Sequence, residues 1–133
     1  MKHEPLLELS MTNPVPLGRH LIADFQGCTP TVLADPALIE NAMLAAVQAG
    51  QAHVLQRHFH HFGPEQGVTG MLLLRESHIS IHTWPEHGYA AIDLFMCGAA
   101  NADAALAVLQ QVLQPAESSQ QVIWRSSIKG IAS

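Results

Sequence analysis

The residues best suited to chemistry in this chain lie between residues 75 and 89, where the sequence is RESHISIHTWPEHGY. This stretch holds two serines, three histidines and two glutamates, although only 13% of the whole chain is charged. Cys97 follows at the end of the next apolar run, residues 90–96. A hydroxyl, an imidazole and a thiol are the groups that nucleophilic attack and proton transfer require.

Each of these residues, taken alone, has an ordinary structural explanation. A cysteine such as Cys97 is most often a small buried hydrophobic side chain, and aromatic residues such as Trp84 and Phe62 belong to a core or an interface. Glu76 and Glu86 are typical solvated acids. Together, however, these explanations leave the polar density of residues 75–89 unaccounted for, because burying so many polar groups is costly. The stretch is therefore the candidate functional site.

The elements that must position these residues can be predicted from hydrophobic spacing. His78, Ser80 and His82 share one face of a predicted strand, and Ile79 and Ile81 share the other. Further strands are predicted over residues 19–25, 52–62, 68–75, 89–97 and 121–125.

Two helices complete the predicted fold. The first has Asp35 as its N-cap and ends at Gly50; the second starts at Asn101 or Asp103 and ends before Pro115. This order predicts an α+β fold: a two-layer sandwich with a mostly antiparallel sheet and two helices on one face. We expect a loosely ordered leader over residues 1–16 and a single domain over residues 17–133.

Composition narrows the class of protein. The net charge of −5 and the lack of a Lys/Arg cluster argue against nucleic-acid binding. No run of 18 apolar residues is present, and the N-terminus does not resemble a signal peptide, so a cytoplasmic protein with reduced Cys28 and Cys97 is expected. The 48% hydrophobic content favours a homo-oligomer.

Metal binding and several common catalytic motifs are not favoured by the spacing. His78 and His82 would lie roughly 13 Å apart on a strand, too far for one ion. The cluster of histidines over residues 58–61 lacks a recognised ligand spacing, so no metal is predicted. There is also no GxSxG elbow, phosphate-binding loop or dinucleotide fingerprint.

The run ESHISIHTWPEHGYAAIDLFMCG, residues 76–98, closely resembles the signature of the small bacterial and archaeal S-adenosylmethionine decarboxylases. Residues 17–21 (LGRHL) and 62–70 also resemble that family, and the likeness covers most of residues 17–113. The resemblance implies a proenzyme that cuts itself between Glu76 and Ser77, giving a β chain of residues 1–76 and an α chain of residues 77–133. A strained turn at 76–77 would assist the cut.

The resemblance also implies the cofactor and the residue roles. Ser77 becomes a pyruvoyl group, which condenses with the α-amine of S-adenosylmethionine and accepts the electrons released with carbon dioxide, as pyridoxal phosphate does. By the same resemblance, His82 serves the elimination step of processing, and Cys97 is the acid of the decarboxylation. Phe62 and Trp84 sandwich the adenine, and Glu86 contacts the substrate.

Two features depart from the family pattern. Thr69 stands where the family usually has a serine that assists processing and catalysis; threonine keeps the hydroxyl but stiffens the side chain. The turn over residues 63–67 is also one residue longer than is typical.

The resemblance further implies a homodimer of cleaved protomers with active sites near the interface, acting in polyamine (spermidine) biosynthesis. Two alternatives stay open at this point: a pyruvoyl-dependent ornithine or arginine decarboxylase of the same superfamily, and an uncleaved regulatory relative. Retention of Phe62 and Trp84 favours a substrate that carries adenine.

Overall fold

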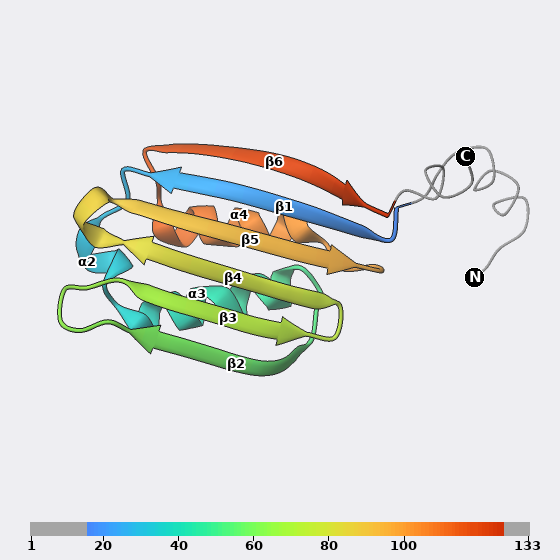
Figure 1. Cartoon of the computed structure of the whole chain (residues 1–133), viewed down its shortest axis with the longest axis horizontal. Helices are drawn as coiled ribbons and strands as arrows, with labels where there is room; N and C mark the ends of the chain where they lie inside the picture. Colours follow the sequence, from blue (N-terminus) through green and yellow to red (C-terminus); the bar gives the residue numbers. More distant parts are fainter. Residues whose placement is uncertain (1–15, 127–133) are drawn as a thin grey trace, which may run out of the picture.

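The computed structural model describes residues 16–126 and shows one antiparallel sheet backed by helices (Figure 1). The sheet has six strands in the order β2-β3-β4-β5-β1-β6, and every neighbouring pair is antiparallel. The predicted two-layer α+β sandwich is therefore confirmed. The strands are β1 (Gly18–Gln26), β2 (Val54–His61), β3 (Val68–Leu74), β4 (Ser77–Trp84), β5 (Tyr89–Cys97) and β6 (Glu117–Arg125).

The two long helices lie side by side on one face of the sheet, as Figure 1 shows behind the strands. In α3 (Pro36–Ala49) the Asp35 side chain accepts a hydrogen bond of 3.1 Å from the Leu38 N–H, which confirms the predicted N-cap. In α4 (Ala102–Leu113) the cap is Asn101, whose side chain accepts from the Ala104 N–H at 3.0 Å. Both helices bury an apolar stripe against the sheet.

Alternation along β3, β4, β5 and most of β1 separates a buried face from an open face. Residues that point toward the helices are almost fully buried, including Leu21, Phe25, Leu72, Ile79, Ile81, Ile92 and Leu94. Their neighbours point to the opposite face, which no described segment covers, and that face carries Ile22, Met71, Leu73, Ile123, His20, His78, Ser80, His82, Asp93 and Phe95. The polar residues of β4 are therefore all on the open face, as the predicted alternation requires.

Three local features differ from the sequence-based expectation. A short helix, α2 (Pro30–Leu33), was not predicted, because four residues are too few to show a period. Strand β6 begins at Glu117 rather than at residue 121, since its first half is polar and lies at the edge of the sheet. The register of β2 shifts between Val54 and Gln56, and this irregularity explains the imperfect alternation of that strand. The predicted leader, up to residue 15, lies outside the described residues.

Candidate active site

The turn that joins β3 to β4 holds the first group of candidate residues. Leu74 pairs with Ser77, so Arg75 and Glu76 form a two-residue connection. Ser77 has a φ of 147°, a backbone region that residues other than glycine rarely occupy. The strain expected at residues 76–77 is therefore present, and it falls on the serine.

The carbonyl oxygen of Glu76 is held by two donors from Cys97. It accepts from the Cys97 N–H at 3.2 Å and from the Cys97 Sγ–H at 2.9 Å. The β4–β5 register accounts for this meeting, because Ser77 pairs with Met96 and thereby brings Cys97 beside the turn. Two donors on one carbonyl oxygen form the kind of arrangement that stabilises negative charge on that oxygen.

The side chain of Glu76 is held by His53, a residue that sequence reasoning missed. The His53 backbone N–H donates to Oε1 at 3.0 Å, and Nδ1 lies 2.8 Å from Oε2. The hydrogen bond from the ring, joined by the one from the backbone, holds the pKa of the Glu76 carboxyl below its ordinary value. No motif signals His53, because it precedes β2 and reaches the turn only through the fold.

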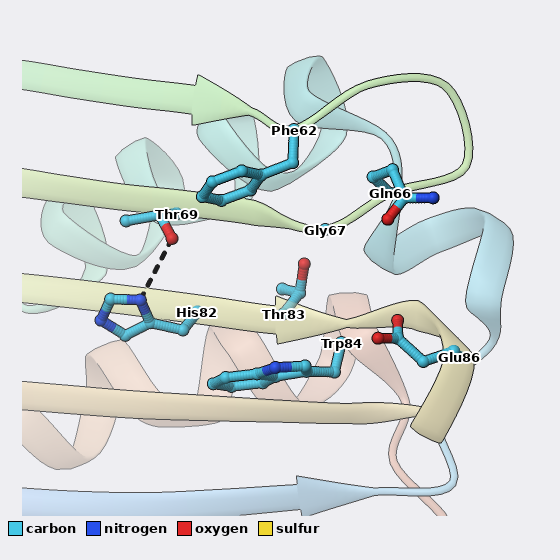
Figure 2. Close-up of a pocket in the computed structure, with 8 residues that line it drawn as sticks. All are labelled: Phe62, Gln66, Gly67, Thr69, His82, Thr83, Trp84 and Glu86. Atoms are coloured by element: carbon cyan, nitrogen blue, oxygen red, sulfur yellow. Dashed lines mark hydrogen bonds between the residues drawn. The ribbon is translucent and has the colours of Figure 1, made fainter.

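The second group of candidates lines a cleft of about 340 Å³ at the other end of β4 (Figure 2). Figure 2 shows the rings of Phe62 and Trp84 on the two sides of this cleft. The Trp84 ring is backed by Tyr89, with centroids 5.3 Å apart and planes tilted by 26°. The cleft is lined by Phe62, Gln66, Gly67, Thr69, His82, Thr83, Trp84 and Glu86. Five residues proposed from the sequence thus meet in one place.

Thr69 and His82 are partners inside this cleft. They are paired across β3 and β4, and Thr69 Oγ1 lies 3.2 Å from His82 Nδ1. The threonine hydroxyl therefore reaches the histidine ring. If Nδ1 donates its proton to Thr69, Nε2 is left with a free lone pair that can accept a proton.

The floor of the cleft depends on a close approach of two backbone segments, at Gly67 and Thr83. A Cβ at Gly67 would lie 2.1 Å from the carbonyl oxygen of Thr83. The Gly67 carbonyl in turn accepts from the Phe62 N–H at 3.0 Å. This bond fixes the backbone of Phe62, whose ring forms one wall of the cleft. The buried Thr83 hydroxyl adds a bond of 2.8 Å from the Val68 N–H and one of 2.8 Å to the Leu33 carbonyl. Glycine is needed at residue 67 for steric reasons alone.

The two groups do not meet within this chain. Glu76, Ser77 and Cys97 stand at one end of β4, and Thr69, His82 and Trp84 stand at or near the other. His82 is five residues from Ser77 on an extended strand, a separation of roughly 16 Å. The expectation of a single constellation from residues 76–97 is therefore split into two half-sites.

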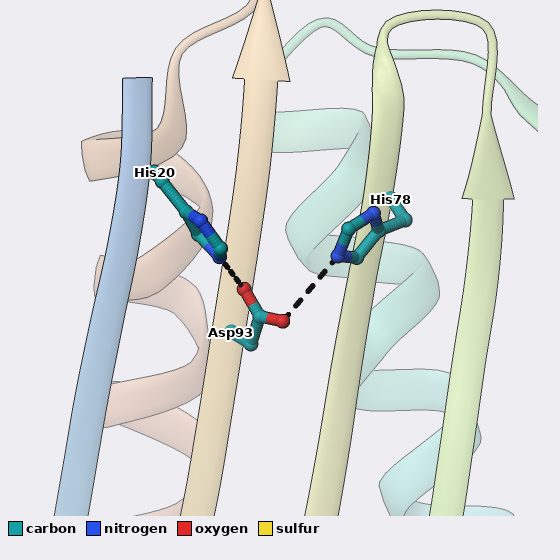
Figure 3. Close-up of side chains that lie close together, drawn as sticks. All are labelled: His20, His78 and Asp93. Atoms are coloured by element: carbon teal, nitrogen blue, oxygen red, sulfur yellow. Dashed lines mark hydrogen bonds and ion pairs between the residues drawn. The ribbon is translucent and has the colours of Figure 1, made fainter. Parts of the chain in front are cut away.

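A third polar cluster lies on the open face between these ends (Figure 3). The Asp93 carboxylate of β5 accepts from His20 Nε2 on β1 and, at 3.3 Å, from His78 Nε2 on β4. Ser80 donates to the same carboxylate at 3.5 Å, and Arg125 donates to His20 Nδ1 at 3.3 Å. The cluster links four strands, and sequence reasoning missed it because the order of the strands was unknown.

This cluster is also the group of described residues with donor atoms suited to a metal ion. The ligand atoms of His20, His78 and Asp93 all lie within 4.8 Å of one another, and two imidazoles with a carboxylate suit zinc or a related ion. Binding at His20 Nε2 would move the ring proton to Nδ1, where it would face the Arg125 guanidinium. The existing bonds therefore favour a hydrogen-bonded network around Asp93 over an ion.

Comparison with known proteins identifies the family of the chain. The family model of S-adenosylmethionine decarboxylase matches residues 19–126, which contain both half-sites. The chain belongs to the S-adenosylmethionine decarboxylase family.

Relatives with known names agree with this membership. An "S-adenosylmethionine decarboxylase proenzyme" of Caldanaerobacter subterraneus subsp. tengcongensis is 50% identical over 82 residues, which are 62% of this chain and 65% of the relative. One from Acidithiobacillus ferrooxidans is 45% identical over 82 residues, 62% of this chain and 61% of the relative. The matches therefore cover less than two thirds of the length of these relatives. The adenosylmethionine decarboxylase structure of Aquifex aeolicus is 36% identical, covers 83% of this chain and 91% of its own, and has a TM-score of 0.77.

Two further expectations can be compared with the described residues. Cys28 is buried and Cys97 exposed, and both are free thiols. Among residues 16–126, no helix has both the length and the apolar character needed to cross a membrane.

Proposed function

We propose that this chain is a proenzyme that cuts itself between Glu76 and Ser77, and that the product decarboxylates S-adenosylmethionine to the aminopropyl donor for polyamine synthesis. The observation that carries the proposal is the pair of hydrogen bonds from Cys97 to the Glu76 carbonyl oxygen, next to a serine with a φ of 147°. Membership of the family and the name "proenzyme" borne by the relatives support it.

The cut begins at the Glu76 carbonyl carbon. Ser77 Oγ attacks this carbon, the bond from the carbon to the Ser77 nitrogen breaks, and an ester links the two residues. Negative charge develops on the Glu76 oxygen, toward which the Cys97 N–H and Sγ–H already point. Release of the strained Ser77 backbone favours the forward direction.

Elimination then separates the two chains. His82 of the partner subunit removes the α-proton of Ser77, and the Glu76 carboxylate leaves as the C-terminus of the β chain (residues 1–76). The hydrogen bond between Thr69 and His82 within each copy orients the imidazole for this step. Hydrolysis at residue 77 releases ammonia and leaves a pyruvoyl group at the head of the α chain (residues 77–133). Ser77 fits this role because it lies at the start of β4 with its own backbone already distorted.

The pyruvoyl group supplies a conjugated carbonyl that takes up the substrate amine and stores the electron pair released with carbon dioxide. Before the cut, the Cys97 thiol donates to the Glu76 carbonyl; after it, the thiol is free to return a proton to the substrate carbon. One side chain thus serves both stages from the same position.

The cleft at the other end of β4 suits the nucleoside part of the substrate. Phe62 and Trp84 offer two aromatic faces to adenine. The Tyr89 ring stacks on the Trp84 ring and helps to hold it in place. Glu86, from the short 3₁₀ turn η1 (Pro85–His87), adds an acceptor at the rim of the cleft. Ornithine has no planar group that would stack between two aromatic faces.

A homodimer completes the active site in this proposal. The half-sites lie at opposite ends of one strand, and the open sheet face between them carries the exposed apolar side chains of Ile22, Met71 and Leu73. Two copies stacked by a two-fold axis across the strands would bring Ser77 of each beside His82 and Trp84 of the partner.

A cytoplasmic location, which keeps thiols reduced, matches the free Cys28 and Cys97.

The proposal is tested with the purified chain and its Ser77→Ala variant. The wild type should appear as two chains in denaturing mass analysis, and Ser77→Ala should stay at full length and lack activity. The cut protein should release carbon dioxide from S-adenosylmethionine and not from ornithine or arginine. An uncut wild type, or carbon dioxide from ornithine or arginine alone, would overturn the proposal.

A further inference from the structure

The hairpin turn at the scissile bond has an unusual distribution of backbone strain. Two-residue hairpin loops usually place positive φ angles at the loop residues themselves. Here neither Arg75 nor Glu76 is among the described residues with positive φ, and the positive angle falls on Ser77, the first residue of β4. A turn of this kind needs contacts from outside the hairpin to keep it in place.

His53 supplies three such contacts, from the connection between α3 and β2. Its carbonyl accepts from the Arg75 N–H at 2.9 Å. Its backbone N–H and its ring Nδ1 hold the two oxygens of the Glu76 carboxylate, at 3.0 and 2.8 Å. Since a carboxylate only accepts, Nδ1 carries the proton. One residue therefore holds both residues of the turn, on the side away from the reacting carbonyl.

The two ends of Glu76 are thus fixed by different segments of the chain. Its carboxylate is held at the start of β2 by His53, and its carbonyl oxygen is held at the end of β5 by Cys97. The Glu76 side chain is only 18% exposed, whereas the His53 ring is 60% exposed. The ring thus has little packing role, and its main contact is with the carboxylate.

We propose that His53 is a positioning residue for self-cleavage, which aims the scissile carbonyl at Cys97 by holding the Glu76 carboxylate. His53 touches neither Ser77 Oγ nor the Glu76 carbonyl, so it takes no part in bond making. The inference rests on the proposed self-cleavage and adds to it a residue outside the 76–98 signature.

The experiment follows cleavage of newly synthesised full-length chain by denaturing mass analysis over time. His53→Ala should cut about tenfold more slowly, the loss expected when a hydrogen bond to a charged group is removed. His53→Asn keeps a donor near the Nδ1 position and should recover most of the rate. His87→Ala removes an exposed histidine at the far end of β4 and should cut like the wild type.

A double-mutant cycle with Glu76→Ala separates positioning from a general loss of stability. If His53 acts through the Glu76 side chain, the double variant should cut no more slowly than Glu76→Ala alone. Hydroxylamine cleaves the ester formed in the first step. The appearance of hydroxylamine-cleaved product should be slower in His53→Ala by the same factor. His53→Ala in the Ser77→Ala background should still unfold cooperatively above the temperature of the cleavage assay, so that the slower cut is measured on folded protein.

The outcomes distinguish this inference from the proposal on which it rests. A wild type that cuts, together with a His53→Ala variant that cuts equally fast, overturns the role of His53 alone. Additive effects of His53→Ala and Glu76→Ala do the same, because they would show that the two residues act independently. A wild type that never cuts overturns both.

Discussion

Cys97 is the residue on which both stages of the proposed reaction depend. Its backbone N–H and its thiol hold the Glu76 carbonyl before the cut, and the thiol is the proposed proton donor afterwards. The backbone donor survives any substitution, whereas the side-chain donor does not. Variants at this position can therefore separate the two roles.

We expect Cys97→Ala to cut about 100-fold more slowly, the cost typical of losing one of two donors to a developing oxyanion. Cys97→Ser keeps a hydroxyl donor and should cut at nearly the wild-type rate. In the fraction that is cut, both variants should lose turnover with KM little changed, because neither supplies a thiol to protonate the substrate carbon.

The measurement combines a cleavage time course with decarboxylation normalised to the reactive carbonyl content. Turnover of cut Cys97→Ala equal to that of the wild type would remove Cys97 from the acid role. Equal cleavage rates for Cys97→Ala and the wild type would remove the thiol from the first step and leave the backbone donor alone.

At the residue scale, much of the candidate site could be predicted from the sequence and part of it could not. Ser77, His82, Trp84 and Cys97 stand in one long, specific motif, so their types and spacing are visible in the chain. His53 and the partners of Asp93 have no motif. Their contacts arise from strand order and from a connection that returns to the turn, and neither is coded locally.

Among the elements, the hairpin of β2 and β3 determines the shape of the cleft proposed to bind the substrate. Its loop brings Phe62 opposite Trp84, and it closes through the bond from the Phe62 N–H to the Gly67 carbonyl. Where β3 starts, its backbone lies against Thr83 of β4 with no room for a side chain at residue 67. The position of the Phe62 ring thus depends on the backbone contact between Gly67 and Thr83.

Gly67→Ala should destabilise the protein by about 1–3 kcal/mol, the usual cost of forcing an extra methyl group into a packed site. The added Cβ would meet the Thr83 carbonyl at 2.1 Å, so β3 must move away from β4. Because Phe62 would shift with it, KM for S-adenosylmethionine should rise in the variant.

Chemical denaturation and steady-state kinetics check this prediction. Gln66→Ala, a change at an exposed neighbour in the same loop, is the matched control and should unfold like the wild type. A Gly67→Ala protein with wild-type stability would show that the strands can separate at no cost and that the close contact does not shape the cleft.

Most elements could be predicted because their signals are local. Asp35 with Pro36 starts α3, and the alternation of His78, Ile79 and Ser80 identifies β4. The sequence pattern predicts a later start for β6 than Glu117, because an edge strand with one weakly buried face needs no hydrophobic pattern. The irregularity after Val54 depends on pairing with β3, which spacing within β2 does not encode.

At the scale of the whole molecule, the two groups of candidate residues lie at opposite ends of one strand. In the chain, Ser77 and His82 are near neighbours, and the motif suggests one site. On the strand they are roughly 16 Å apart, because extended backbone rises about 3.3 Å per residue. Closeness in sequence within a strand therefore implies separation in space, and the open sheet face leaves room for a partner to supply the missing half.

Mixing two inactive variants tests whether the partner does so. Ser77→Ala lacks the nucleophile and His82→Ala lacks the base, so neither should cut alone. In a mixed dimer, one site combines Ser77 of the His82→Ala chain with His82 of the Ser77→Ala chain, and cleavage should return there. Only the His82→Ala chain should be cut, and distinct tags on the two chains reveal which one breaks.

In the control mixture, the Ser77→Ala chain is replaced by a chain that carries both Ser77→Ala and His82→Ala. This chain offers no His82 to the mixed site, so cleavage should not return. Tag pull-down establishes that the chains have exchanged partners in both mixtures. Exchange without cleavage would place Ser77 and His82 in the same protomer, and the strand would then have to bend sharply within five residues. Since β4 pairs without interruption with β3 and β5 over those residues, such a bend would break both ladders, and we expect complementation.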